Sequence, residues 1–256
     1  MRRLLAAVTL SAVLAPVAGL SAAEKDTRFF ELRIYTAAPG KLDALNARFR
    51  DHTVALFAKH GITNVGYFVP VDNAANQLVY LLAYPSKEAH DASWKAFQAD
   101  PDWQAARKES EKDGKLVTKV EQRFLTPTDY SPALKIESKG DRVFELRTYT
   151  ATKGNLAALN GRFREHTMKL FEKHGITNIS YWNLAPGQKG EDVTLVYMLA
   201  HPSVEAAKAS FDEFRKDPDW VAAKEASEKA AGGSLTEPKG GVVSQFLKPV
   251  DYSALK

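Results

Sequence analysis

The stretch that decides the fold is FELRIYTA at residues 30–37, which returns as FELRTYTA at residues 144–151. From these starting points, residues 30–67 and 144–181 align without a gap and are identical at 26 of 38 positions. Two shorter matches follow: DPDW at 100–103 and 217–220, and DYS at 129–131 and 251–253. Self-similarity at a fixed offset is the mark of a duplicated structural unit. The chain therefore contains two diverged copies of one module.

The copies differ in length at two places, around residues 187–190 and 232–241, which are rich in glycine. Insertions of this kind are tolerated in surface loops. We place the first domain at residues 28–130, a linker at 131–141 and the second domain at 142–253.

Each copy has the pattern strand, helix, strand, strand, helix, strand. In the first copy, β-branched and aromatic residues predict four strands, at residues 29–36, 65–71, 78–84 and 117–125. Gly61 is placed to end the first helix, Ser86 to cap the second, and Asp100 with Pro101 to restart it. The order βαββαβ predicts an α+β protein made of two tandem ferredoxin-like modules, each with an antiparallel sheet and helices on one face.

Alternation along the first strand divides its side chains between two faces. Phe30, Leu32 and Ile34 form an apolar face, which we expect to pack under the helices. The third strand, residues 78–84, is apolar on both faces, so neither face should meet water. The two copies are therefore expected to pack sheet to sheet, as a pseudo-symmetric α/β barrel within one chain.

The polar face of the first strand then points between the sheets and supplies the main candidate residues. These are Glu31, Arg33 and Tyr35 in the first copy and Glu145, Arg147 and Tyr149 in the second. One interpretation is structural: a Glu–Arg ion pair with a tyrosine hydroxyl attached. The other is a cavity lined for a small ligand. Tyr67 and Tyr181 are added as further ligand-binding candidates.

His52 and His166 occupy equivalent positions in the two copies. With Leu42, Leu45, Phe49 and Leu56, His52 falls on the apolar stripe of the first helix. A histidine there is more often a hydrogen-bonded core residue than a catalyst or a metal ligand. Neither copy has a recognisable metal-ligand spacing such as His-x-x-x-His, so we predict no metal and no cofactor.

Composition excludes several classes of protein. The chain has no cysteine, which rules out disulfides, thiolate metal sites and a cysteine nucleophile. Its net charge of +4 includes Arg2 and Arg3, and without them 33 basic residues face 31 acidic ones. A nearly neutral protein gives no reason to expect nucleic acid as a partner.

Residues 1–23 resemble a secretory signal peptide. Arg2 and Arg3 precede an uncharged apolar run from Leu4 to Leu14, and small residues at 21–23 could support cleavage. The run is too short for a stable membrane anchor, and a mitochondrial transit peptide would be richer in arginine. We expect an exported protein, in a bacterial periplasm or secreted.

FELRxYTA, the HGIT at residues 60–63 and DPDW at 100–103, in this order and once per copy, resemble the NIPSNAP family. The resemblance implies a dimeric α/β barrel fold and little chemistry, since the family has no agreed enzymatic activity. Eukaryotic members are mitochondrial and linked to vesicle transport and mitochondrial quality control. The chain departs from the family in the third strand, where YLLAY and YMLAH replace the frequent Tyr-x-Trp-x-Tyr.

We therefore expect a NIPSNAP-like protein that binds a small ligand or a protein partner without catalysing a reaction. The alternative is a cofactor-independent monooxygenase or isomerase acting between the sheets. In that case Arg33 and Arg147 would stabilise an anionic substrate, and Glu31, Tyr35 or His52 would handle protons. A third alternative is that the barrel forms between chains, which would make the protein a homo-oligomer.

Overall fold

The computed structural model describes residues 25–256, so the predicted signal peptide lies outside the described residues. The first half contains β1 (Phe29–Ala37), α1 (Leu42–Arg48), the π-helical turn η1 (Phe49–Thr53), α2 (Val54–Lys59), β2 (Thr63–Pro70), β3 (Gln77–Tyr84), α3 (Lys87–Ala99), α4 (Pro101–Ser110) and β4 (Val117–Pro127). The second half repeats this order with β5 (Val143–Thr150), α5 (Leu156–Arg162), η2 (Phe163–Thr167), α6 (Met168–Lys173), β6 (Thr177–Leu184), β7 (Thr194–His201), α7 (Val204–Lys216), α8 (Pro218–Ala230) and β8 (Val242–Pro249).

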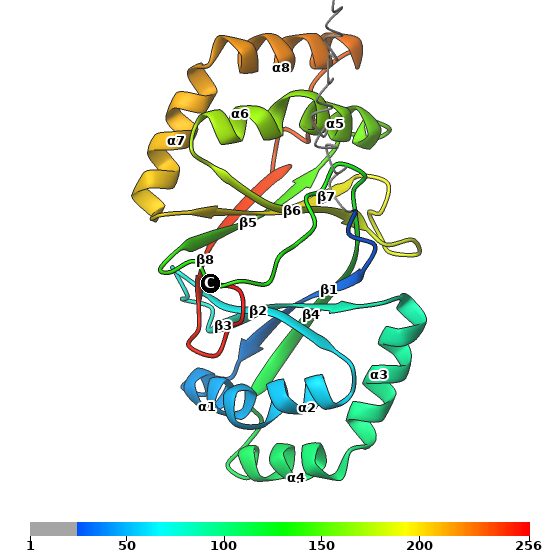
Figure 1. Ribbon diagram of the computed structural model, residues 1–256, viewed down its shortest axis with the longest axis vertical. Coiled ribbons are helices and arrows are strands. Elements are labelled where there is room, and N and C mark those ends of the chain that lie inside the picture. Colours follow the sequence, from blue (N-terminus) through cyan, green and yellow to red (C-terminus); the bar gives the residue numbers. More distant parts are fainter. Residues whose placement is uncertain (1–24) are drawn as a thin grey trace, which may run out of the picture.

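All eight strands form one closed antiparallel barrel in the order β1-β3-β2-β8-β5-β7-β6-β4. Within each half, the first strand lies between the third and fourth strands, as in a ferredoxin-like sheet. The halves join at two seams, where β2 pairs with β8 and β4 pairs with β6. The helices of the two halves cover opposite sides of the barrel (Figure 1). The predicted fold, an α+β barrel closed within one chain, is confirmed.

The predicted helix boundaries rest on caps that are present. The Ser86 side chain accepts a hydrogen bond from the Ala89 N–H at the start of α3, and Asp100 caps α4 through the Asp102 N–H. Gly61, just after α2, has a φ of 74°, a conformation that glycine adopts without strain. None of the helices among residues 25–256 combines the length and the apolar character needed to cross a membrane.

The orientation of the strand faces differs from the prediction. Phe30 and Leu32 do not lie under the helices; they join a core inside the barrel that contains apolar residues from both halves. Rings meet across the interior, with Phe30 and Trp182 centred 5.5 Å apart and Phe68 and Phe144 5.1 Å apart.

Glu31, Arg33 and Tyr35 therefore lie between the barrel and the helices of the first half, not between the two sheets. This placement gives the charged pair its hydrogen-bond partners. The barrel interior offers apolar side chains from both halves, whereas α3 carries an indole N–H and an imidazole that can bond to a carboxylate.

Candidate functional site

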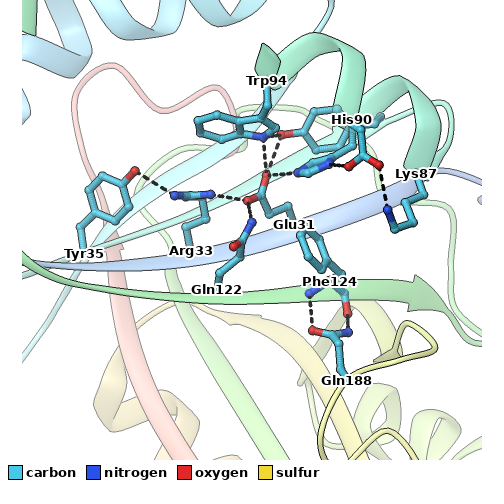
Figure 2. Close-up of polar contacts among 11 residues, drawn as sticks. Glu31, Arg33, Tyr35, Lys87, His90, Trp94, Gln122, Phe124 and Gln188 are labelled. Carbon is cyan, nitrogen blue, oxygen red and sulfur yellow. Dashed lines mark hydrogen bonds and ion pairs between the residues drawn. The ribbon is translucent and has the colours of Figure 1, made fainter. Parts of the chain in front are cut away.

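The side chain at the centre of the site is Glu31, on β1. It is fully buried, and both its oxygens accept hydrogen bonds from neighbouring side chains (Figure 2). Oε1 accepts from Arg33 Nη1 at 2.5 Å and from the Gln122 amide on β4. On this side the carboxylate is held entirely by the sheet.

The second oxygen faces the helices. Oε2 accepts from the Tyr84 hydroxyl at 2.7 Å and from Trp94 Nε1 at 2.9 Å, and it lies 3.3 Å from His90 Nε2. The opposite ring nitrogen of His90 lies 2.8 Å from the Asp91 carboxylate, which binds Lys87 at the surface. A chain of polar contacts thus runs from the buried carboxylate to solvent (Figure 2).

These partners determine the charge of the carboxylate. Burial alone would raise the pKa of Glu31, but the His90 hydrogen bond and the positive charge of Arg33 outweigh it and lower the pKa to about 2. Burial and the adjacent Glu31 raise the pKa of Tyr84, so its hydroxyl stays a donor. Glu31 is therefore an anion near neutral pH, with hydrogen-bond donors on both of its oxygens.

Arg33 connects this pocket to solvent. Its Nη2 donates to the Tyr35 hydroxyl at 3.2 Å, and its Cζ lies 4.5 Å from the centre of the Trp94 ring. The predicted Glu31–Arg33–Tyr35 contacts are thus present. The Arg33 side chain is 12% exposed, and its Nε has no hydrogen-bond partner in the described part of the chain.

A cleft of about 800 Å³ opens in front of Arg33, between β1 and β4 on one side and the helices of the first half on the other. Aromatic rings line much of it: Tyr35, Phe49, Phe57, Trp94, Phe97 and Trp103. A volume of this size is in the range that holds a small organic ligand.

Arg48, on α1, is buried in the wall of the cleft. It donates to Glu111 at 3.0 Å, and its Cζ lies 5.3 Å from the centre of the Trp103 ring. Arg107 donates to the other oxygen of Glu111 at 3.3 Å. One carboxylate therefore serves two guanidinium groups.

The second half rebuilds the glutamate pocket with different partners. Glu145 accepts from Arg147 Nη1 at 2.5 Å and from the Ser244 hydroxyl at 2.5 Å, and His201 Nε2 lies 3.0 Å from its other oxygen. Arg147 also donates to the Tyr149 hydroxyl at 3.1 Å. Burial would raise the pKa of Glu145, but the His201 hydrogen bond and the charge of Arg147 lower it.

The other predicted site residues lie elsewhere. Tyr67 and Tyr181 are fully buried between sheet and helices, each donating to an asparagine three residues earlier, Asn64 or Asn178. They pack against the neighbouring strand, stacked on Tyr80 and Tyr197 respectively.

The predicted placement of His52 and His166 on the apolar stripe is wrong, because both are exposed. In η1 the Val54 N–H bonds to the Phe49 carbonyl, five residues back, which inserts one extra residue into the turn. Thr53 takes the buried position instead and donates to the Arg48 carbonyl. The same shift in η2 buries Thr167.

Four partners of Glu31 were missed from the sequence: Tyr84, His90, Trp94 and Gln122. The comparison of copies hid them because they align with His201, Ala207, Phe211 and Ser244. A usable signal was the i, i+4 spacing of His90 and Trp94, which places both on one face of α3. Residues 25–256 hold no group of three His, Cys, Asp or Glu side chains that could bind a metal ion.

Similar structures include a "putative monooxygenase" from Lactobacillus acidophilus, with 12% identity and a TM-score of 0.56 over 88% of this chain and 94% of its own. An anthrone oxidase-like protein has 13% identity and a TM-score of 0.53 over 91% of this chain and 95% of its own. An uncharacterized NIPSNAP-like domain protein from Burkholderia xenovorans is 23% identical over 43% of this chain and 94% of its own, with a TM-score of 0.39. At such identities the first two share the fold alone.

No curated protein matches the sequence. The NIPSNAP family model matches it twice, at residues 30–132 and 144–254, which together span most of the chain and coincide with the two halves of the barrel. The chain therefore belongs to the NIPSNAP family, with one family domain in each half.

Proposed function

We propose that the protein binds a small organic ligand in the cleft of its first half and does not catalyse a reaction on it. The observation that carries this is the cleft itself, about 800 Å³ in volume, whose lining combines aromatic rings with polar and charged side chains, Arg33 among them. Concave spaces that combine apolar and aromatic surface with placed polar groups are typical of ligand sites. The same concavity favours a small molecule over a protein partner.

The state of Glu31 supports binding over catalysis. A carboxylate has about four lone-pair sites, and Glu31 accepts four hydrogen bonds, from Arg33, Gln122, Tyr84 and Trp94. With a pKa of about 2 and no free lone pair, Glu31 is poorly suited to accept a proton near neutral pH. His52 is not among the residues that line this cleft.

The alternative function was a cofactor-independent monooxygenase or isomerase acting between the sheets. That mechanism needs a cavity lined by Arg33, Arg147 and a proton acceptor. In residues 25–256 the inside of the barrel instead holds an apolar cluster from both halves, and Arg33 and Arg147 face the helices. The named relatives with oxidase-like descriptions add no support beyond the fold.

Native mass spectrometry of the protein purified from its own host tests the binding proposal. We expect a retained small molecule, lost when Gln104→Trp places an indole at the cleft, where Gln104 is an exposed lining residue. Val221→Trp, at the equivalent exposed position of α8, is the matched control and should keep the ligand. Equal retention in both variants, or no bound mass in the unaltered protein, would contradict the proposal.

Two further expectations stay predictions. Export to a periplasm or to the medium rests on residues 1–23 and is testable by cell fractionation. A homo-oligomer is testable by light scattering. It is not needed to close the barrel, since β2–β8 and β4–β6 already pair within one chain.

A further inference from the structure

The cleft of the first half carries more positive charge than its carboxylates balance. Arg33 is paired with Glu31, and Lys119 with Glu121. Three cationic side chains then remain in the lining, Arg48, Arg107 and Lys115, against the single carboxylate of Glu111. An excess of positive charge on a concave wall attracts anions, and because Arg107 and Lys115 are exposed, added salt screens this attraction.

Two arginines of the cleft lie beside tryptophan rings. Arg33 is beside Trp94, and Arg48 is beside Trp103, at 4.5 and 5.3 Å from the ring centres. Arg48 is 4% exposed, and its Nε is buried without a hydrogen-bond partner in the described chain. A guanidinium group can bond to a planar carboxylate through two parallel hydrogen bonds, and the neighbouring tryptophan rings offer area for a flat apolar body.

Resting on the proposed function, we infer that the first-half cleft takes an organic carboxylate with a planar aromatic body. The ligand's carboxylate lies toward Arg48, Arg107 and Lys115. There it adds a second negative charge to that of Glu111, opposite three cationic side chains. The aromatic body lies along Trp94 and Trp103.

The second half provides an internal reference for this inference. Ala38 N–H bonds to the Leu116 carbonyl, and Thr152 N–H makes the same bond to Leu235, so Lys115 corresponds to Ser234. On α7, Phe211 stands where α3 has Trp94. The second half thus has one cation fewer and lacks one of the two indoles, and we expect its affinity for the same ligand to be much weaker.

Isothermal titration calorimetry with three probes tests the inference. The probes are 2-naphthoate, its neutral isostere 2-naphthamide, and decanoate, an aliphatic carboxylate. We expect one 2-naphthoate bound per chain, with quenching of tryptophan fluorescence, an affinity that falls with added salt, and much weaker binding of the other two. The double variant Arg107→Gln, Lys115→Gln changes two exposed positions. It should weaken the affinity for 2-naphthoate roughly five- to tenfold and leave the affinity for 2-naphthamide unchanged.

The matched control is Lys224→Gln, at the position of the second half that corresponds to Arg107, which should leave the affinity unchanged. Equal binding of 2-naphthoate and 2-naphthamide, or tighter binding of decanoate, would overturn the ligand class while leaving the cleft as a binding site. Weakening by Lys224→Gln would overturn the assignment to the first half. If no probe binds, the inference fails, and the retained-ligand measurement on host-purified protein decides the proposed function separately.

Discussion

The two glutamate pockets are built on the same strand positions but closed by different side chains. In the first half, a histidine on α3 and a tyrosine at the end of β3 reach Glu31. In the second half the end of β7 carries His201, which reaches Glu145 directly, and the α7 position equivalent to His90 is Ala207. Each half therefore keeps one imidazole beside its carboxylate, supplied by a helix in one case and by a strand in the other.

The difference shows which part of the arrangement the fold requires. The Glu–Arg–Tyr contacts along the first strand have the same partners and nearly the same distances in both halves. The groups that close the pocket from the helix side have changed, and only the first half places an indole there. The ion pair is thus common to both halves, whereas Trp94 lies on the helix side of the cleft that we assign to a ligand and has no counterpart indole in the second half.

Loss of the buried Glu31 carboxylate should cause the largest decrease in the free energy of unfolding. Glu31→Gln leaves Arg33 buried without its counter-ion, and breaking a buried pair costs about 3–5 kcal/mol. Glu145→Gln should cost less, because fewer donors lose an anionic acceptor in the second half. Urea denaturation of the two variants measures the difference in the free energy of unfolding. Equal losses would show that the additional donors around Glu31 contribute nothing to stability.

Replacing the residues that close the Glu31 pocket by their second-half counterparts should have an intermediate effect on the free energy of unfolding. Tyr84→His and His90→Ala each convert one position to its second-half counterpart, and each should cost about 1–2 kcal/mol by leaving Glu31 short of a donor or crowding it. Together they recreate the arrangement of His201 and Ala207. The double variant should therefore be about 1 kcal/mol more stable than the sum of the single losses predicts. Strict additivity would mean that the imidazoles of the two halves are not equivalent.

The repeat made the fold predictable from the sequence, and the strand faces show where that approach failed. FELRxYTA occurring twice, with a third strand apolar on both sides, was enough to predict two sheets buried against each other. It could not tell which face of the first strand would enter the barrel. Alternation separates Phe30 and Leu32 from Glu31 and Arg33, but both faces are buried, so the pattern has no solvent side to orient it.

The candidate site was predictable only in part, for a related reason. Glu31, Arg33 and their contact are visible in the sequence as i, i+2 neighbours on a strand. Trp94 and His90 come from a helix about sixty residues away, and they are absent from the aligned positions of the second half. A comparison of copies finds what both halves share, so it detects the structural ion pair and misses the side chains that distinguish the cleft.

The pH dependence of the free energy of unfolding should also distinguish the two halves, by less than the substitutions above. Burial would lower the pKa of His90, but hydrogen bonds to Glu31 and Asp91 raise it above its usual 6.5. A raised folded-state pKa means that the native state holds the proton more tightly than the unfolded chain. Its stabilising effect is complete below pH 6.5 and is lost as the pH rises through the raised value.

Urea midpoints measured from about pH 5 to about pH 9 test this. The unaltered protein should lose stability across the upper part of this window, and His90→Ala should remove that part of the slope. Ala207→His, which adds an imidazole at the equivalent position of the second half, is the reciprocal variant. An unchanged slope in His90→Ala would place the titrating group elsewhere.

The smallest effect is expected where the two halves behave alike. His52→Ala and His166→Ala should each change the free energy of unfolding by no more than about 0.5 kcal/mol, because both side chains are exposed on the π-helical turns. Variants of the adjacent threonines serve as the reference for these changes in stability. Thr53→Ala and Thr167→Ala remove a buried hydroxyl that bonds to the carbonyl five residues earlier, and each should cost about 1 kcal/mol. A histidine variant that lost as much stability as the adjacent threonine variant would show that the histidine side chain is buried. That outcome would contradict the extra residue that η1 and η2 insert into the helix.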